Sequence, residues 1–437
     1  MGKVLVLGAG LVARPGVRYL LDKGMNVRVA SRTLSKAEKL VEGHPNGEAV
    51  RWTVDEKERL SEMVKEADVV VSLLPYIYHV EVAKVCLEHR KHLVTTSYVS
   101  QDMRALDGEA KTRDVILLNE IGLDPGIDHM SAMRTIDHIR KRGGKILAFR
   151  SYCGALPAPE AADNPFKYKF AWSPRGVALA GRNSARFIED GKEINIPGEE
   201  LFRHYFTMEI EGLGTFEVYP NRDSVPYMDT YGIKEAHTIF RGTLRYPGWC
   251  DLWYAISRLG MLDVEEKEWK GKTYRDYMRE LIGAKTDDIE KETAEFLGIP
   301  EDSDVMEKLR WLSIFSDDPI KIEKGGNIDV LVEKLTEKLA YKEGERDMVI
   351  LRDEVLGEVN GKKERHISVL IDYGEIGKDT AVARTVSLPA AVAVKLIIEG
   401  EIKERGVHIP THPDIYAPVL EELKNLGIEM REEIKEE

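Results

Sequence analysis

Short apolar runs alternate with amphipathic stretches along the first 140 residues of the chain. Residues 4–7 form a continuous apolar run, typical of a strand buried on both faces, which leads directly into Gly8-Ala9-Gly10. Residues 11–23 have the apolar spacing of an amphipathic helix that ends at Gly24, and residues 26–30 alternate like a second strand. A strand, a glycine turn, a helix and a second strand predict a βαβ unit.

The same alternation continues as far as residue 142. Further strands are predicted at 50–54, 68–74, 92–96 and 115–119, and further helices at 56–65, 80–90, 103–113 and 129–142. Strands that alternate with helices are typical of a doubly wound parallel sheet, so the predicted fold class is α/β with a Rossmann-type sheet. Ligands of such sheets bind beyond the carboxyl ends of the strands, and the loops there are 75–76, 97–98 and 120–128.

The rest of the chain has a mixed pattern that predicts two further domains. A strand is expected at 145–152, a loop at 153–160, mostly helix at 251–315, strands at 348–352 and 366–373, and an apolar stretch at 380–400 with Pro389 at a helix start or kink. We expect that the last stretch packs against the first domain, because it needs a large surface to cover it. The predicted domains are a Rossmann domain from 1–130 with about 385–437, a central domain of strands and helices from about 131–250 and 315–384, and a small helical domain from about 251–314.

Composition and charge narrow the functional class. The chain has 437 residues, 43% of them hydrophobic, which is enough for a large folded core. Its formal net charge of −13 has the wrong sign for a general binder of nucleic acid or anionic membrane. Three widely separated cysteines form no disulfide framework and no metal motif, so we expect a cytoplasmic protein without a metal site. No apolar run is long enough to cross a membrane.

The glycine turn and the end of the second strand predict a nucleotide site. The fingerprint is G-A-G-L-V-A, in which the two glycines allow a tight turn and the close approach of a pyrophosphate to the helix N-terminus. Where NAD enzymes place an acid after the second strand, this chain has Ser31-Arg32-Thr33. A guanidinium binds a 2′-phosphate well, so these residues favour NADP over NAD.

The motifs along the chain resemble one known family, the saccharopine dehydrogenases of the L-glutamate-forming type, also called saccharopine reductases. The resemblance spans nearly the whole chain. The motifs that carry it are residues 8–12 with 14–15, 72–76, 95–98, 119–129, 151–154 with 156–160, 168–170, 219–224, 241–246 and 344–347.

The resemblance implies a reversible reaction in lysine metabolism. Saccharopine, NADP and water are converted to glutamate, 2-aminoadipate 6-semialdehyde and NADPH, with hydride transfer at an imine carbon. It also implies a Rossmann domain built from both ends of the chain, a central α/β mixed-sheet domain for substrate binding and dimerisation, a small helical domain and a homodimer. Two other hypotheses stay open at this point: another imine-reducing dehydrogenase of the carboxynorspermidine type, and a Rossmann protein that senses a dinucleotide without turnover.

The resemblance also assigns roles to individual residues. Saccharopine carries three carboxylates and two amines, so its site needs several cations and hydrogen-bond donors, and Arg222 and Arg245 are suited to clamping carboxylates. Imine hydrolysis needs protons moved on and off nitrogen and oxygen, for which Tyr98, Asp124 and Cys153 are the candidate catalytic groups. The implied substrate-binding residues are Ser97, Tyr98, Asp124, Arg222, Thr243, Leu244 and Arg245. The implied cofactor-binding residues are Gly8, Ala9, Gly10, Leu11, Val12, Ser31, Arg32, Thr33, Pro75, Leu123, Asp124, Pro125 and Ser173.

Overall fold

A computed structural model describes residues 2–437, which form two compact units. The first unit holds residues 2–147 together with Leu351–Glu437, and the second holds Ala148–Ile350. The chain passes between the units within two long strands, β7 (Lys145–Pro157) and β15 (Asp347–Val359). The N-terminal and C-terminal segments therefore share one unit.

The first unit is built on a seven-stranded sheet in the order β17-β6-β5-β4-β1-β2-β3, in which all neighbouring strands are parallel. The order from β3 to β6 is that of a Rossmann-type doubly wound sheet, which confirms the predicted fold class. The strands are β1 (Lys3–Leu7), β2 (Asn26–Ser31), β3 (Gly47–Arg51), β4 (Val69–Ser72), β5 (His92–Thr95), β6 (Ile116–Leu118) and β17 (Gly406–His408).

Helices from both ends of the chain accompany this sheet. They are α1 (Ala13–Asp22), α2 (Leu34–Val41), α3 (Lys57–Glu66), the 3₁₀ turn η1 (Tyr76–Tyr78), α4 (His79–Glu88), α5 (Gln101–Arg104), α6 (Asp107–Thr112), α7 (Ile127–Lys141), α15 (Ala381–Ile398) and α16 (Pro413–Asn425). β17 adds a strand from the C-terminal part of the chain to the free edge of β6. The first unit also contains an antiparallel pair of β16 (Lys362–Tyr373) and β18 (Arg431–Glu436).

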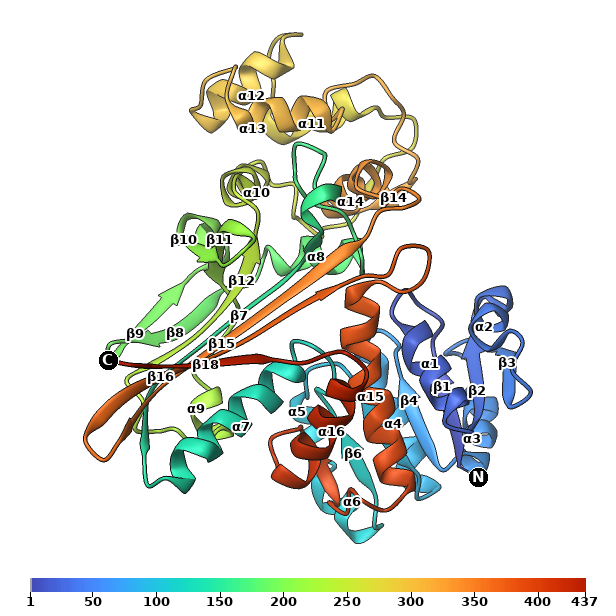
Figure 1. Cartoon of the computed structure of the whole chain (residues 1–437). Coiled ribbons are helices and arrows are strands. Elements are labelled where there is room, and N and C mark those ends of the chain that lie inside the picture. Colours follow the sequence, from blue (N-terminus) through green and yellow to red (C-terminus); the bar gives the residue numbers. More distant parts are fainter. Residues whose placement is uncertain (1) are drawn as a thin grey trace. The chain divides into compact units, whose positions relative to one another are not determined.

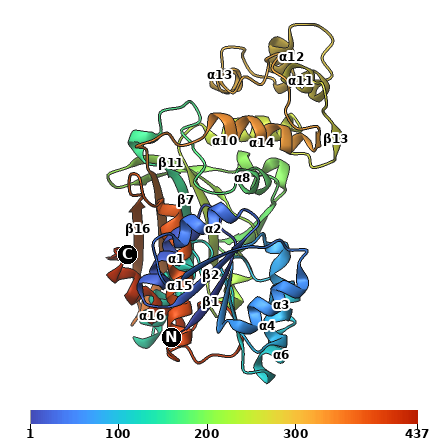
Figure 2. The ribbon, with the colours of Figure 1, turned by 90° about the vertical axis from the view of Figure 1, so that its right-hand side faces the viewer.

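The apolar stretch near residue 390 forms helix α15, which lies beside α1 in Figures 1 and 2. The Gly16 amide donates to the Ser387 hydroxyl at 3.0 Å, and a Cβ on Gly16 would lie 2.9 Å from the Ser387 carbonyl oxygen. Glycine is therefore required for this close approach of two helix backbones. By length and composition α15 could cross a membrane, but 78% of it is buried inside the protein, as in a core helix. Pro389 lies inside the helix.

The second unit contains a mixed sheet, as predicted. Its strands lie in the order β10-β11-β12-β7, antiparallel except for the parallel pair of β12 with β7, and β8 pairs with both β12 and β9. The additional strands are β8 (Ala185–Glu189), β9 (Lys192–Ile196), β10 (Phe206–Ile210), β11 (Gly214–Pro220) and β12 (Thr238–Arg245). Residues 249–311 are mostly helical, which confirms the pattern-based prediction for 251–315.

The other elements of the second unit are helices, short turns and one small strand pair. They are η2 (Pro159–Ala161), α8 (Pro174–Ala180), η3 (Gly198–Arg203), α9 (Tyr227–Thr230), α10 (Trp249–Arg258), β13 (Lys267–Glu268), α11 (Tyr274–Ile282), α12 (Ile289–Leu297), α13 (Asp304–Trp311), β14 (Lys324–Gly325) and α14 (Asn327–Lys338).

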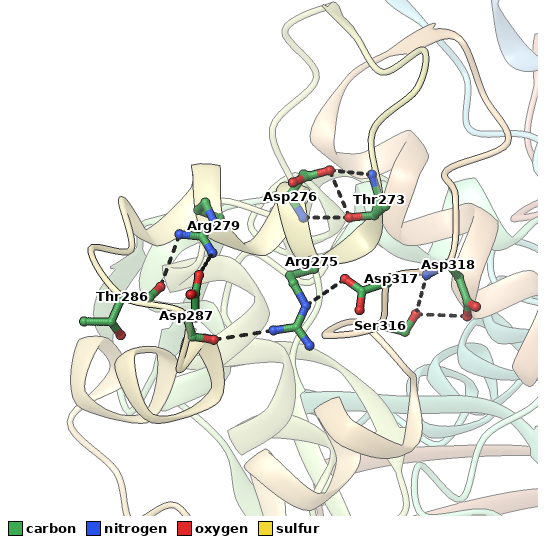
Figure 3. A network of polar contacts seen from close by, with 9 residues as sticks. All are labelled: Thr273, Arg275, Asp276, Arg279, Thr286, Asp287, Ser316, Asp317 and Asp318. Carbon is green, nitrogen blue, oxygen red and sulfur yellow. Dashed lines mark hydrogen bonds and ion pairs between the residues drawn. The ribbon is translucent and has the colours of Figure 1, made fainter.

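Polar contacts hold the ends of the helices between residues 273 and 318 (Figure 3). Thr273 and Asp276 form a capping box at the start of α11, which typically contributes about 1 kcal/mol. Arg275 pairs with Asp317 at 2.8 Å, but both side chains are more than a third exposed, so the pair adds little stability. Burial of the aromatic face of α11 is the larger contribution.

Several pattern-based boundaries differ from the structure, among them β15 (Asp347–Val359), which is longer than the expected 348–352, and three others are informative. The strand expected at 50–54 is β3 (Gly47–Arg51), because Thr53 folds back and donates to the Glu56 carboxylate in a turn. The helix expected at 103–113 is divided into α5 and α6. The loop expected at 153–160 begins only after Pro157, since β7 continues along β12 and Gly154 packs against Leu244, where a Cβ would lie 2.8 Å from the Leu244 side chain.

Candidate active site

The glycine turn after β1 has a shape that suits a dinucleotide. Gly8 has φ +111°, a conformation that favours glycine, and a Cβ there would lie 3.0 Å from the Leu73 carbonyl oxygen. A Cβ on Gly10 would meet no atom within 4 Å, so this face of the turn is open. Val12 precedes α1 without a side-chain cap. In the first helical turn the Ala13 amide donates to the Gly10 carbonyl, Pro15 has no N–H and the Gly16 amide donates to Ser387, so the Arg14 amide is the group left available to a bound phosphate. These features fit a pyrophosphate at residues 8–12.

The end of β2 presents a guanidinium and hydroxyls. Arg32 is exposed and makes no hydrogen bond or ion pair within residues 2–437. Thr33 precedes α2 without capping it, and the Ser31 hydroxyl accepts only a 3.3 Å bond from the Thr33 amide. Pairing of β2 with β1 places these residues beside the glycine turn, at the same carboxyl edge of the sheet. Arg32 and the hydroxyls of Ser31 and Thr33 therefore fit a 2′-phosphate, and none of these three residues is the acid with which NAD enzymes bind the ribose hydroxyls.

The side chain of His79 hydrogen-bonds hydroxyl groups at the carboxyl ends of both β4 and β5. Its Nδ1 lies 2.9 Å from the Ser72 hydroxyl, and its Nε2 lies 2.9 Å from the Ser97 hydroxyl and 3.1 Å from that of Thr95. Burial lowers the pKa of His79 to about 4, so the ring is neutral near pH 7. The ring therefore holds the side chain of Ser97, a predicted substrate-binding residue, at the strand end.

This depressed pKa predicts a pH dependence of stability. Because the pKa of His79 is about 4 in the folded protein against 6.5 for an ordinary histidine, the unfolded chain binds the proton first as pH falls. The free energy of unfolding should therefore decrease as pH falls from about 6.5 to 4, with His79 contributing about 2–3 kcal/mol of the loss. His79→Gln should reduce this loss by that amount in urea unfolding at pH 7 and 4.5. Identical pH dependence of the two proteins would contradict the prediction.

The loop after β6 folds tightly against the start of α7 and carries Asp124. The Gly122 amide donates to the Pro125 carbonyl at 2.9 Å, and the Ile127 amide donates to the Gly122 carbonyl at 2.9 Å. Gly126 has φ +150°, and a Cβ there would lie 2.0 Å from the Gly122 carbonyl oxygen, so no other residue fits. The Tyr98 hydroxyl donates to Asp124 Oδ1 at 3.0 Å. The first unit thus brings two predicted catalytic side chains into contact.

Leu123 and Pro125 lie on either side of Asp124 and are buried, whereas Asp124 is partly accessible. Pro75 is exposed at the end of β4, and its carbonyl accepts the Tyr78 amide at 3.0 Å. All of the predicted cofactor residues of the first unit therefore lie in loops at the carboxyl ends of its parallel strands, as the sequence led us to expect.

In the second unit, strand pairing brings Cys153, Thr243 and Arg245 to one face of the mixed sheet. Thr243 is in register with Cys153 of β7, and Arg245 lies two residues further along β12 on the same face. Leu244 points to the opposite face, where its side chain is fully buried, and its carbonyl accepts from Arg245 Nη1 at 2.7 Å. The backbone carbonyl of Leu244, and not its side chain, therefore contacts the polar residues of the other face.

Arg245 is a buried cation without an anionic partner. Only 6% of the residue is exposed, and the guanidinium lies 5.2 Å from the ring of Tyr168 and 5.1 Å from that of Trp249. Its Nε has no hydrogen-bond partner, and no carboxylate among residues 2–437 forms an ion pair with it. Taking a guanidinium out of water without a counter-ion is costly, and a bound carboxylate would offset that cost.

The two remaining predicted residues of the second unit are exposed. Arg222 has φ +55° in the loop after β11, and its carbonyl accepts the Arg186 amide at 3.0 Å. Ser173 caps α8, where its hydroxyl accepts the Gly176 amide at 3.1 Å. Both residues are accessible to a ligand from solvent.

Sequence reasoning missed the partners that surround these residues. The aromatic neighbours of Arg245 come from Tyr168, before α8, and Trp249, at the start of α10, and no local pattern joins them to Arg245. His79 was noted beside the strand-end loops, but its contact with Ser97 depends on the pairing of β4 with β5. The sequence signal that could have indicated this contact is a single histidine at the start of the helix that follows a buried strand.

Comparisons with known proteins agree with this geometry. Residues 4–118 match the family model for the saccharopine dehydrogenase NADP binding domain, and residues 122–428 match the model for the saccharopine dehydrogenase C-terminal domain. The chain is 40% identical to saccharopine dehydrogenase [NADP(+), L-glutamate-forming] of Schizosaccharomyces pombe, covering 100% of both chains. The protein of that name from Saccharomyces cerevisiae is 40% identical over 99% of each chain.

A solved structure extends the similarity to the whole fold. Apo histidine-tagged saccharopine dehydrogenase (L-Glu forming) from Saccharomyces cerevisiae superposes with a TM-score of 0.90 at 38% identity, covering 100% of both chains. At this coverage the likeness includes both units and not only the nucleotide-binding sheet.

Proposed function

Because this chain belongs to the saccharopine dehydrogenase family, we propose that Arg245 and its aromatic neighbours bind one carboxylate of saccharopine. The chain is an NADP-dependent oxidoreductase that acts on CH–NH bonds. It interconverts saccharopine with L-glutamate and 2-aminoadipate 6-semialdehyde in lysine metabolism. Neither the carboxynorspermidine-type activity nor a purely sensory role is favoured.

The observation that carries the substrate assignment is the unpaired guanidinium of Arg245. A buried cation whose Nε has no partner is complete only when an anion binds, and a substrate with three carboxylates supplies one. Thr243, on the same face, has a hydroxyl that can donate to the same ligand. Arg222, which is exposed, is suited to a second carboxylate at the rim.

NADP is held by the first unit in this proposal. Residues 8–12 would hold the pyrophosphate, and Arg32 with the hydroxyls of Ser31 and Thr33 would hold the 2′-phosphate. Pro75 and residues 123–125 would add further contacts to the cofactor. NADP supplies the hydride acceptor, and its reduced form supplies the donor.

Proton movement at the imine nitrogen and the carbinolamine oxygen is assigned to Tyr98 and Asp124. The phenol donates to the carboxylate at 3.0 Å, so a proton can pass along this contact, and either group can hydrogen-bond the substrate. Ser97, held by His79, offers a further hydroxyl to the substrate. Cys153 is the alternative acid/base group, on the same face as Thr243 and Arg245.

The activity is tested by absorbance at 340 nm. Purified protein with saccharopine and NADP should produce NADPH, and glutamate with 2-aminoadipate 6-semialdehyde should consume it. Carboxynorspermidine is the control substrate, since it has fewer carboxylates for Arg222 and Arg245 to bind. Oxidation of the control at a higher kcat/KM than saccharopine would contradict the substrate assignment.

We also propose a homodimer in a reducing, cytoplasmic compartment. The family resemblance supports the dimer, and the three free cysteines support the compartment. Sedimentation equilibrium should give twice the protomer mass, and fractionation of the source cells should place the protein with cytosolic markers.

A further inference from the structure

Glu120 holds the backbone on both sides of Tyr98. Its amide donates to the carbonyl of Ser97 at 3.2 Å, and its Oε1 accepts the amide of Val99 at 2.9 Å. Ser97 and Val99, the two neighbours of Tyr98 in the chain, are thus both hydrogen-bonded to Glu120: Ser97 to its backbone and Val99 to its side chain. This arrangement fixes the direction in which the Tyr98 side chain leaves the loop.

His129 ties the same carboxylate to helix α7. Its Nε2 lies 2.7 Å from Glu120 Oε2, and an ionised carboxylate only accepts, so this nitrogen carries the hydrogen. Glu120 is 4% exposed and His129 is fully buried. His129 lies in the first turn of α7, directly after the tight loop that carries Asp124. The pair therefore connects the segment that bears Tyr98 to the segment that bears Asp124.

Glu120 adopts a backbone conformation that is unfavourable for its residue type. Its φ is +56°, in the left-handed region, which costs a non-glycine residue roughly 1–2 kcal/mol. Such a conformation persists where surrounding contacts determine it, and here they are the bonds to Ser97, Val99 and His129. A buried contact between a histidine and a carboxylate is by itself weak evidence of a stabilising role.

We propose that Glu120 and His129 are positioning residues that set the Tyr98 hydroxyl against the Asp124 carboxylate. This inference rests on the function proposed above for Tyr98 and Asp124. A misplacement of about 1 Å at a catalytic contact can cost on the order of a hundredfold in rate. Loss of the pair should therefore lower the rate of turnover while leaving the nucleotide turn at residues 8–12 unchanged.

A double-mutant cycle tests the proposal. Glu120→Asn is the disruptive variant, because asparagine tolerates positive φ but is too short to reach Val99 and His129. We expect it to lower kcat/KM for saccharopine about fiftyfold in the wild-type background. In the Tyr98→Phe background, which has no hydroxyl to position, the same change should cost less than about twofold. Glu120→Gln keeps the side-chain length and one acceptor oxygen, which can still accept the Val99 amide, while its NH2 group faces His129 and needs the imidazole tautomer that accepts there; it should keep activity to within about threefold of the wild type.

Further measurements separate positioning from a general loss of structure. His89→Gln removes another histidine contact of the same unit, partly buried and 2.6 Å from the Ser61 hydroxyl, and should leave kcat/KM unchanged. Binding of NADPH, followed by its fluorescence, should be the same in all variants. If Glu120→Asn does not fold, His129→Gln takes its place in the cycle. We expect His129→Gln to lower kcat/KM for saccharopine about tenfold in the wild-type background and to have no further effect in the Tyr98→Phe background.

The outcomes distinguish this inference from the proposed function. Equal losses from Glu120→Asn in both backgrounds would overturn the positioning role and leave the role of Tyr98 intact. A Tyr98→Phe protein with wild-type kcat/KM would overturn the role of Tyr98, and the positioning role with it.

Discussion

The Arg245→Met protein is expected to be more stable than the wild type and nearly unable to bind saccharopine. The guanidinium is 6% exposed, its Nε has no partner, and methionine packs well against the rings of Tyr168 and Trp249. Replacement of an unpaired buried charge by an apolar side chain often stabilises by about 1–4 kcal/mol. The midpoint of thermal unfolding should therefore rise by roughly 2–4 °C or more.

Saccharopine binding should be lost in the same variant. Removal of one member of a buried charged contact typically costs 2–5 kcal/mol, so KM for saccharopine should rise by about a hundredfold. The Kd for NADPH should not change. Arg150→Met is the matched control, since Arg150 lies on β7 and already pairs with Glu189 at 2.5 Å. A lower unfolding midpoint with unchanged saccharopine kinetics for Arg245→Met would show that the guanidinium has a structural role.

The Arg32→Asp protein should prefer NAD to NADP. In the wild type the exposed guanidinium can pair with a 2′-phosphate, and an aspartate there would repel the phosphate and accept the ribose hydroxyls of NAD. A charge-assisted contact of this kind corresponds to a tenfold to hundredfold preference for NADP. The ratio of kcat/KM values for the two cofactors should therefore fall by at least that factor in the variant.

Two further measurements test whether the cofactor preference comes from Arg32: its dependence on salt and the effect of a second charge-reversal variant. The wild-type preference should shrink as ionic strength rises, because the contact is partly exposed and screened. Arg59→Asp carries the same change of charge on helix α3, where Arg59 pairs with Glu56 at 3.2 Å, and should keep the cofactor ratio of the wild type. Equal wild-type activity with NAD and NADP at low salt would mean that Arg32 points into solvent.

The fold of the first unit could be predicted from sequence because its signals are local. Apolar runs such as residues 4–7 specify strands buried on both faces, and Gly8 is needed at φ +111° whatever lies far away in the chain. Helix α15 was also readable, since its apolar stretch spans Ala381–Ile398. Where local signals were weak, as at the exposed edge strand β3, the predicted boundary was wrong by three residues.

Strand boundaries in the second unit depended on packing that no local pattern reports. Gly154 was read as part of a loop, because residues 153–160 contain a glycine and two prolines, residue types that are typical of loops. In the structure the glycine lies within β7 and allows close contact with Leu244 of β12. The reason for a glycine at this position is a neighbouring strand that is distant in sequence.

By itself the sequence determined the α/β class, the nucleotide turn, and the residue types suited to NADP and a tricarboxylate, because each depends on neighbouring residues or on a motif. Only the tertiary structure decided which of them meet. Parallel pairing of strands brings Tyr98 to Asp124 and Ser97 to His79, and pairing of β12 with β7 sets Thr243 beside Cys153. Burial between Tyr168 and Trp249 leaves the Nε of Arg245 without a hydrogen-bond partner within residues 2–437, and that environment is a property of the folded chain.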